Sequence, residues 1–217
     1  MMRQHPSGRP ATASAILDVA QRLVQTRGYN GFSYADIAAD LAITKAALHY
    51  HFATKAQLGE ALVARYESSF AELLAVIDAD SADAVDRLAG YVGVYRDVLN
   101  DQRICLCGML AAEYQTLPGG MQAAVSRFFA MNEVWLERVL EDGRAAGTLA
   151  FAGSGRDTGR LFMAGLEGAL LLSRATQEVA RFDATAEALV ASVLPAGAQR
   201  PARSAGAARE IEAGHVA

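Results

Sequence analysis

The chain has 217 residues and a mass of 23.0 kDa, with 52% hydrophobic residues and a mean hydropathy of +0.13. This apolar content is enough for a substantial core and excludes a fully disordered chain. No apolar run reaches the roughly 18 to 20 residues that cross a bilayer, and the N-terminus lacks a signal-peptide core. We therefore expect a soluble, cytoplasmic protein without membrane contact.

The composition favours helices over strands. Aromatic residues make up only 7% of the chain, and the apolar residues are mostly Ala, Leu and Val. We therefore expect an all-α fold. The two cysteines, Cys105 and Cys107, are too few for a disulfide framework and point to different faces of a helix, so we expect reduced thiols.

Charge is distributed unevenly along the chain. Residues 1–56 contain six Lys and Arg against three acidic residues, whereas residues 57–217 contain fourteen Arg against twenty-one. Both lysines of the chain, Lys45 and Lys55, bracket one short segment of the basic part. Clustered cations on a small domain favour a polyanionic partner, with a solvated helix face as the simpler alternative.

Three helices are predicted in the N-terminal part. The first begins at Thr12 or Ser14 and ends at Arg27, where Gly28 is a typical stop signal. Ser33 is a typical N-cap for a short second helix, with Asp36 three residues later in a capping-box arrangement, and a third helix begins three or four residues after the second ends. Two short helices joined by a tight turn indicate a helix-turn-helix domain over residues 12–56.

Six further helices are predicted, most of them within residues 57–195, which are expected to form a ligand-binding and dimerisation domain. We expect them at about 54–77, 81–99, 103–115, 118–146, 157–177 and 183–193, with Ser81 as the cap of the second of these. Residues 1–11 and 196–217 contain little aliphatic side chain beyond alanine, and we expect both to be disordered.

Residues 20–58 resemble the N-terminal DNA-binding domain of the TetR family of bacterial transcriptional regulators. The resemblance rests on Gly28-Tyr29, Ser33, Ile37-Ala38, Thr44-Lys45 and the run Tyr50-His51-Phe52 followed by Lys55. It implies a homodimer that binds a palindromic operator, most often as a repressor, and that is released by a small apolar or electrophilic effector. The stretch CLCGMLAAE at residues 105–113 is similar to one subgroup of the family.

The resemblance and the helix period together predict the DNA-binding residues. Base reading is expected from the start of the third helix, and phosphate contacts from its flanks. The expected base-reading residues are Thr44, Lys45, Ala46, Ala47 and His49, with phosphate as the alternative for Lys45, and Tyr50 is expected to reach either a base or the backbone. The expected backbone contacts are Ser33, Tyr34, His51 and Lys55, with core packing as the alternative for His51. Ala46 stands where family members often carry glycine. We expect no metal at the His49-x-His51 pair, because helical ligand pairs lie three or four residues apart.

The family encloses its effector among the helices that correspond to the fourth to seventh of this chain. The residues expected to line the effector pocket are Tyr66, Phe70, Tyr91, Tyr95, Cys105, Met109, Glu113, Phe128 and Trp135. The alternative for such an aromatic set is plain core packing. Cys105 is either a small core residue or, near Arg103 and a helix start, an electrophile or oxidant sensor.

The apolar stretch LFMAGLEGALLL at residues 161–172 predicts a helix that is covered on several sides. The resemblance assigns it to a four-helix dimer interface, and the alternative is burial within one chain. The expected interface residues are Met163, Gly165, Leu166, Gly168, Ala169 and Leu172. Glu167 within this stretch is expected to pair with Arg160, Arg174 or a partner subunit.

An enzyme is not expected. The sequence contains no G-x-S-x-G element, no phosphate-binding loop and no convincing metal cluster, and we expect no cofactor. The alternative from another class is a helical carrier of small molecules that does not bind DNA.

Overall fold

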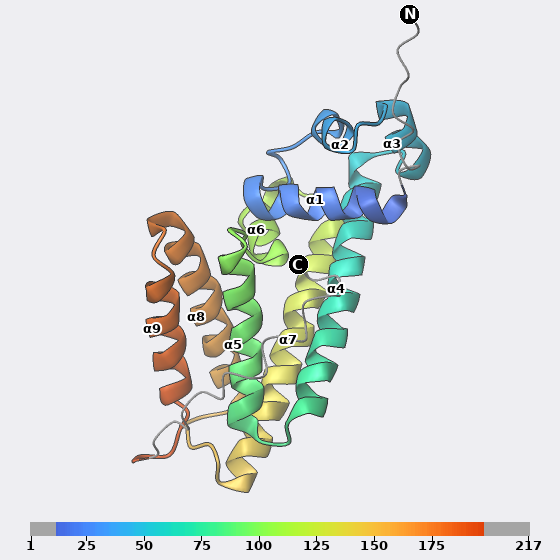
Figure 1. Ribbon diagram of the computed structural model, residues 1–217. Coiled ribbons are helices and arrows are strands. Elements are labelled where there is room, and N and C mark those ends of the chain that lie inside the picture. The colour runs from blue at the N-terminus through green and yellow to red at the C-terminus, as the bar shows by residue number, and fades with distance from the viewer. Residues whose placement is uncertain (1–11, 198–217) are drawn as a thin grey trace, which may run out of the picture. The chain divides into compact units, whose positions relative to one another are not determined.

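The computed structural model describes residues 12–197, and every regular element in this range is helical (Figure 1). The elements are α1 (Ala13–Arg27), α2 (Tyr34–Asp40), α3 (Lys45–His51), α4 (Lys55–Asp80), α5 (Ala84–Asn100), α6 (Leu106–Ala112), the 3-10 turn η1 (Tyr114–Thr116), α7 (Gly119–Ala146), α8 (Gly155–Thr176) and α9 (Val179–Ala191). The predicted all-α fold is confirmed. Within the described range no helix is long and apolar enough to cross a membrane. Disorder was expected for residues 1–11 and 196–217. Except for residues 196 and 197, these lie outside the described range.

The chain divides into two compact units. The head unit runs to Arg65 and also contains Leu106–Val125, whereas the body unit contains Tyr66–Cys105 and the chain from Ser126 onward. Helices α4 and α7 each contribute residues to both. This division differs from the boundary expected after residue 56, because α6 packs against α1 within the head unit.

Side-chain caps fix the helices of the head unit. Thr12 caps α1, which ends at Gly28 with a φ of +82°. The Ser33 hydroxyl accepts from the backbone of α2 while Asp36 binds the Ser33 backbone N–H at 2.8 Å, so the capping box predicted from the sequence is present. Thr44 caps α3 in the same way. Buried Ile16, Ile37, Leu48 and Leu58, one from each of α1 to α4, form the core of this unit.

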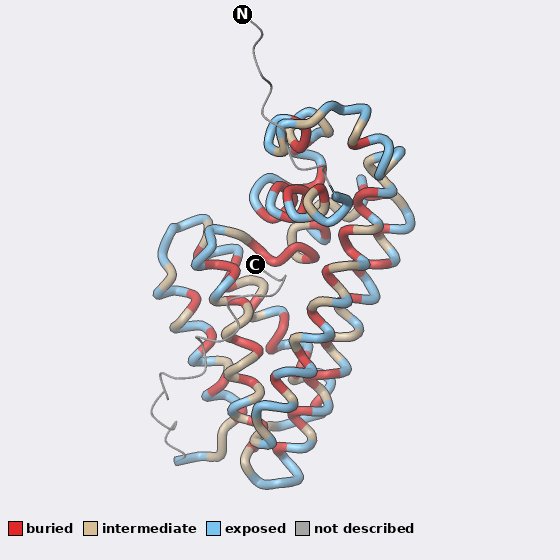
Figure 2. Tube along the Cα trace, turned by 45° about the vertical axis from the view of Figure 1, so that its right-hand side comes forward, coloured by how far each residue is buried: buried red, intermediate tan, exposed pale blue. Residues whose placement is uncertain are grey.

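In the body unit, α8 and α9 lie side by side and both pack against α5 (Figure 1). Buried and exposed residues alternate along α8 and α9 with the helical period (Figure 2). Phe162, Leu166 and Leu170 of α8 and Phe182 of α9 are almost fully buried. These apolar side chains form one side of the body core.

Several helix boundaries differ from those expected. Asp83, not Ser81, caps α5, because its carboxylate accepts the N–H of Val85 at 2.7 Å. The sixth helix is shorter than predicted, since Gln102 takes a left-handed φ of 59° and the helix starts at Leu106. The ninth begins at residue 179, four residues earlier than expected, directly after the left-handed Gln177 that ends α8.

Candidate DNA-binding surface and effector site

Helix α3 presents its first residues to solvent. Leu48 is fully buried and anchors the helix, whereas Lys45 and Ala46 are exposed and Ala47 is half-buried. The hydroxyl of Thr44 is occupied as the cap and accepts the N–H of Ala47 at 3.2 Å. The buried side of the helix is therefore held in the core by Leu48, while its N-terminal side chains remain available for contact.

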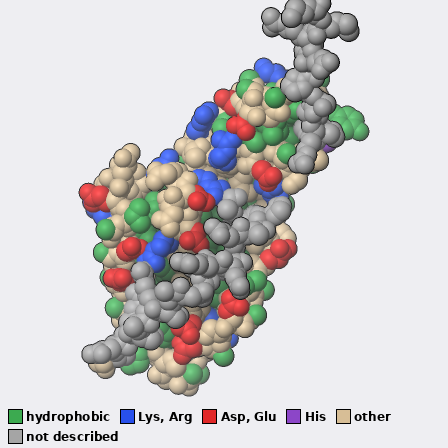
Figure 3. All heavy atoms as spheres, viewed as in Figure 1, with side chains coloured by type: hydrophobic (Ala, Val, Ile, Leu, Met, Phe, Trp, Pro, Cys, Tyr) green, Lys and Arg blue, Asp and Glu red, His purple; other side chains and the backbone are tan. Residues whose placement is uncertain are grey.

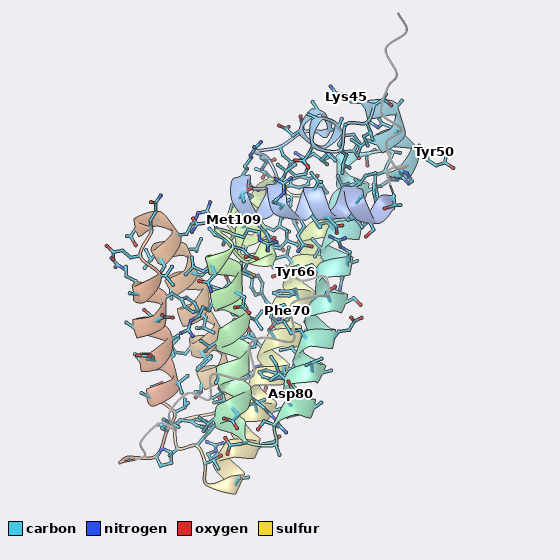
Figure 4. The ribbon with its side chains drawn as sticks, viewed as in Figure 1. Lys45, Tyr50, Tyr66, Phe70, Asp80 and Met109 are labelled. Carbon is cyan, nitrogen blue, oxygen red and sulfur yellow. The ribbon has the colours of Figure 1, made fainter. Side chains whose placement is uncertain are left out.

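The aromatic end of α3 is also exposed. Tyr50 is 87% exposed, and its ring meets His51 edge-on at 5.3 Å between centroids. The Nδ1 atom of His49 lies 3.0 Å from the carbonyl oxygen of Ala53. In Figure 4, Lys45 and Tyr50 both project away from the neighbouring helices of the head unit. Expected base-reading residues thus share one accessible helix.

Ser33 and Tyr34 have structural partners within the head unit. The Ser33 hydroxyl donates to Asp36 Oδ2 at 2.7 Å, and the Tyr34 hydroxyl donates to the carbonyl oxygen of Phe52 at 2.8 Å. Burial raises the pKa of Tyr34. A phosphate oxygen only accepts hydrogen bonds, so a phosphate contact by either hydroxyl would have to displace the bond that it donates here.

Lys55 is not placed as the sequence suggested. Its ammonium group donates to the carbonyl oxygens of Tyr29 at 2.6 Å and Phe32 at 2.5 Å. It also lies over both rings, at 4.6 and 4.2 Å from their centroids. Burial lowers its pKa. Lys55 therefore holds the connection between α1 and α2, and we remove it from the expected phosphate contacts.

Ion pairs use most of the positive charge of the head unit. Arg22 pairs with Asp40 at 2.6 Å, Arg27 with Asp36 at 3.4 Å, and Arg65 with Asp18 at 2.6 Å. Figure 3 accordingly shows basic and acidic side chains mixed over this unit. Among its described cations, Lys45 alone is exposed and outside an ion pair. The exposed positive charge of the described head unit that is not used in an ion pair therefore lies at the start of α3.

Glu113 lies in the head unit, where its carboxylate binds backbone. Its Oε2 accepts the N–H of Tyr29 at 2.6 Å, and the N–H of Asn30 lies 3.3 and 3.4 Å from its two oxygens. The Asn30 side chain also donates to Thr116 at 2.7 Å. This carboxylate is engaged in fixing the turn after α1, so we remove Glu113 from the expected effector set. Met109, on α6, is half-buried in the same unit.

The other expected effector residues all belong to the body unit, where the aromatic ones stack into one cluster. The Phe70 ring lies 5.0 Å from Phe128 and the Tyr66 ring 5.4 Å from Phe128. Trp135 stacks on Tyr91 with 5.4 Å between centroids and 21° between planes. Such contacts are typical of a rigid aromatic core.

A line of buried polar groups crosses this cluster. The Tyr91 hydroxyl donates to Asn132 Oδ1 at 3.0 Å and lies 3.3 Å from the Tyr95 hydroxyl. Tyr95 in turn donates to Glu167 Oε1 at 3.4 Å, and the Cys105 thiol also hydrogen-bonds to this carboxyl. Burial raises the pKa values of both tyrosines. Both therefore remain neutral and act as hydrogen-bonding groups.

Four of the expected residues line a hollow. Tyr66, Phe70, Tyr95 and Cys105 surround it together with Val94 and Val98, and the Tyr66 hydroxyl lies 3.9 Å from the Cys105 sulfur. Figure 4 shows Tyr66 and Phe70 turned from α4 toward α5. About 180 Å³ is free of atoms there, open solvent included, and nowhere is it wide enough for a water molecule. Tyr91, Phe128 and Trp135 pack behind this lining.

Glu167 contacts this lining through Tyr95 and Cys105, and the sequence analysis did not include it in the effector set. Of its expected partners, Arg160 binds Glu133 at 3.0 Å, and no Lys, Arg or His among residues 12–197 forms an ion pair with Glu167. Its Oε2 is buried without a hydrogen-bond partner. Burial raises the pKa of this carboxyl to about 7. The signal in the sequence was the single acidic residue within an apolar run.

Half of the expected dimer residues are buried within the chain. Met163, Leu166 and Ala169 are at most 7% exposed, and Gly165 lies against Leu189 of α9. They form part of the body core, because α8 turns this face toward its own unit. Gly168 faces open space and Leu172 is 57% exposed. The outward face of α8 consists of Leu161, Ala164, Gly168 and Leu172.

Cys105 and Cys107 are both buried thiols, not joined in a disulfide, and they belong to different units. In the described part of the chain, no three His, Cys, Asp or Glu side chains come together as a metal site would require.

Known proteins match both parts of the chain. Residues 16–62 match the family described as bacterial regulatory proteins, tetR family, and residues 84–189 match the tetracyclin repressor-like C-terminal domain. The chain is 26% identical over 183 residues to transcriptional regulator AcuR of Cereibacter sphaeroides, covering 79% of this chain and 82% of that protein.

Solved structures agree with these matches. A TetR-family regulator from Agrobacterium tumefaciens superposes with a TM-score of 0.82 at 33% identity, covering 84% of this chain and 97% of that one. A TetR regulator from Legionella pneumophila superposes with a TM-score of 0.75 at 28% identity, with the same coverage. The chain therefore belongs to the TetR family of bacterial transcriptional regulators and is a regulator, not an enzyme.

Proposed function

We propose that this regulator is a cytoplasmic repressor that binds a palindromic operator as a homodimer, with α3 of each protomer in the major groove. The observation that carries the proposal is the exposed set Lys45, Ala46, His49 and Tyr50 on a helix whose Leu48 is fully buried. A lysine at this position can donate to guanine or phosphate, and the methyl group of Ala46 can meet a thymine methyl. Thr44, Ala47, Ser33, Tyr34 and His51 complete the proposed surface.

The outward face of α8 supports the dimer. Leu161 and Leu172 are 65% and 57% exposed, and Ala164 and Gly168 lie between them. Small residues between large ones let a second helix approach closely. An isologous contact between two copies of this face gives the two-fold symmetry that a palindromic operator requires.

The body unit supplies the proposed effector site. Tyr66, Phe70, Tyr95 and Cys105 line the hollow, and it has no room for a water molecule in this conformation. An effector that opens it binds a conformation different from this one, and a difference in affinity between two conformations is what couples a ligand to DNA release. The buried state of Cys105 favours a reversibly bound molecule over an electrophile. No observation favours a carrier that does not bind DNA.

The test is a selection of bound sites from random duplex DNA, followed by affinity measurements on variants. Lys45→Ala and Tyr50→Ala are each expected to lose about 1 to 3 kcal/mol of operator binding, or about 5- to 150-fold, if they read bases. Arg181→Ala, an exposed cation on α9, removes the same charge and serves as the control. Unchanged affinity for both α3 variants, or no selected site, would refute the proposal.

A further inference from the structure

We propose that the effector is a small organic ammonium cation with a short apolar chain, held by the Glu167 carboxylate and the rings of the hollow. The inference deepens the proposed effector site and rests on it. It starts from an imbalance: a carboxyl oxygen, Oε2 of Glu167, is buried without a partner beside a lining of Tyr66, Phe70 and Tyr95.

An unpartnered buried carboxyl oxygen costs free energy unless something else compensates for it. The groups that approach this site from the surrounding helices are Tyr91 and Tyr95 of α5, Cys105 before α6, and Tyr66 of α4, which contacts Cys105. None of these carries a positive charge. On α9, Asp183 is paired with Arg96 of α5. Arg174 lies two turns along α8 and forms no ion pair with Glu167 among the described residues.

The chemistry of the hollow separates three kinds of ligand. A neutral apolar molecule would fill the space but leave Oε2 unsatisfied. An anion would need Glu167 to stay protonated, and Arg103, two residues before Cys105, is already paired with Asp101. An ammonium group supplies N–H donors and the missing positive charge, and aromatic rings such as those of Tyr66, Phe70 and Tyr95 attract cations as well. Glu167 is hydrogen-bonded to Tyr95 and Cys105 of the lining, so a cation is the ligand that satisfies this carboxyl once these side chains move.

The size of the hollow limits the ligand. The hollow is nowhere wide enough for a water molecule, so a ligand enters only if lining side chains move, and a short chain needs the smallest movement. Val94 and Val98 provide apolar contact for that chain, and Glu167 lies one hydrogen bond behind the lining, at Tyr95. Since the hollow is too narrow for water here, entry must move lining side chains, which links occupancy to the conformation of the body unit.

Proton linkage gives the proposal a signature. Because the pKa of Glu167 is about 7 in the unliganded protein, its carboxyl is mostly protonated at pH 6 and mostly ionised at pH 8. A cation binds the ionised form, so binding releases a proton and the affinity rises with pH. The expected gain is about tenfold from pH 6 to pH 8. A carboxylate ligand that accepts a hydrogen bond from protonated Glu167 would show the opposite dependence.

The experiment compares butylammonium, 1-butanol and butanoate, which share one chain and differ in charge. Isothermal titration calorimetry is performed on the full chain at pH 6 and pH 8, where an alkylamine stays protonated. We expect butylammonium to bind at least about tenfold more tightly than 1-butanol at pH 8, with the pH dependence given above. Equal affinity for the three, preference for butanoate, or binding of none of them would overturn the inference.

Variants separate the charge from the shape of the site. Glu167→Gln keeps the size of the side chain and should abolish both the preference for butylammonium and its pH dependence. Glu178→Gln, an exposed residue before α9, removes the same charge and should change neither. A preference retained in Glu167→Gln would overturn the inference. Operator affinity is measured on the same preparations: operator binding without ammonium preference refutes only this inference, whereas absence of operator binding refutes the proposed function.

Discussion

The carboxylate of Glu113 is expected to stabilise the turn between α1 and α2. It accepts the N–H of Tyr29 at 2.6 Å and makes longer contacts of 3.3 and 3.4 Å with the N–H of Asn30. A hydrogen bond to a charged group contributes about 1.5 to 3 kcal/mol. Because Glu113 is half-buried and its second donor is distant, we expect Glu113→Ala to cost about 2 kcal/mol. Glu113→Gln, which keeps one acceptor oxygen, should cost about half as much.

Hydrogen exchange measures this effect at the site itself. If the Tyr29 and Asn30 amides exchange through local opening, a loss of about 2 kcal/mol accelerates their exchange about 30-fold. Operator affinity should fall in parallel, because this turn sets where α2 begins.

The control for this experiment is Glu72→Ala, an exposed position on α4. It removes the same side chain and should leave Tyr29 and Asn30 unaffected. If the Tyr29 and Asn30 amides of Glu113→Ala exchanged at the parental rate, the hydrogen bonds to Glu113 would not stabilise this turn, and the reasoning would be refuted.

Three further predictions concern the body unit. If the outward face of α8 forms the proposed dimer, Leu172→Arg should give a folded monomer, whereas Leu166→Arg should unfold the chain. Light scattering and circular dichroism measure the two outcomes, and a dimeric Leu172→Arg would exclude this face as the interface. Cys105 should react with iodoacetamide much more slowly in native than in unfolded protein, and mass spectrometry showing equal rates would contradict its burial. The raised pKa of Glu167 means that the folded state binds a proton more tightly than the unfolded state, so stability should fall as pH rises from about 4.5 to about 7, by about 2 to 3 kcal/mol. Denaturant unfolding against pH checks this, and the slope over this range should be smaller in Glu167→Gln.

Local signals in the sequence predicted the head helices well. The Ser33 capping box and the stop at Gly28 depend on residues within a few positions of each other, so the pattern alone was sufficient. The cap of α5 was harder, because Ser81 and Asp83 are both good caps and only the geometry selects Asp83.

Roles that depend on distant partners could not be predicted. The family resemblance implied a phosphate contact for Lys55, yet its partners are backbone carbonyl groups that no residue type signals. Glu113 is 84 residues from Tyr29 in the sequence. Arg160 was one of the partners expected for Glu167, but it binds Glu133 on α7. In each case the tertiary fold, and not the local pattern, chooses the partner.

Trp135 gives the protein an intrinsic optical probe. It is the only tryptophan in the chain, it stacks on Tyr91, and its Nε1 donates to Asp78 at 3.1 Å. The hydroxyl of Tyr91 lies 3.3 Å from that of Tyr95, and Tyr95 lines the hollow. Indole fluorescence depends on the groups around the ring, so a rearrangement of this lining should change the emission of unlabelled protein. The head unit contains no tryptophan, and the signal therefore reports on the body unit alone.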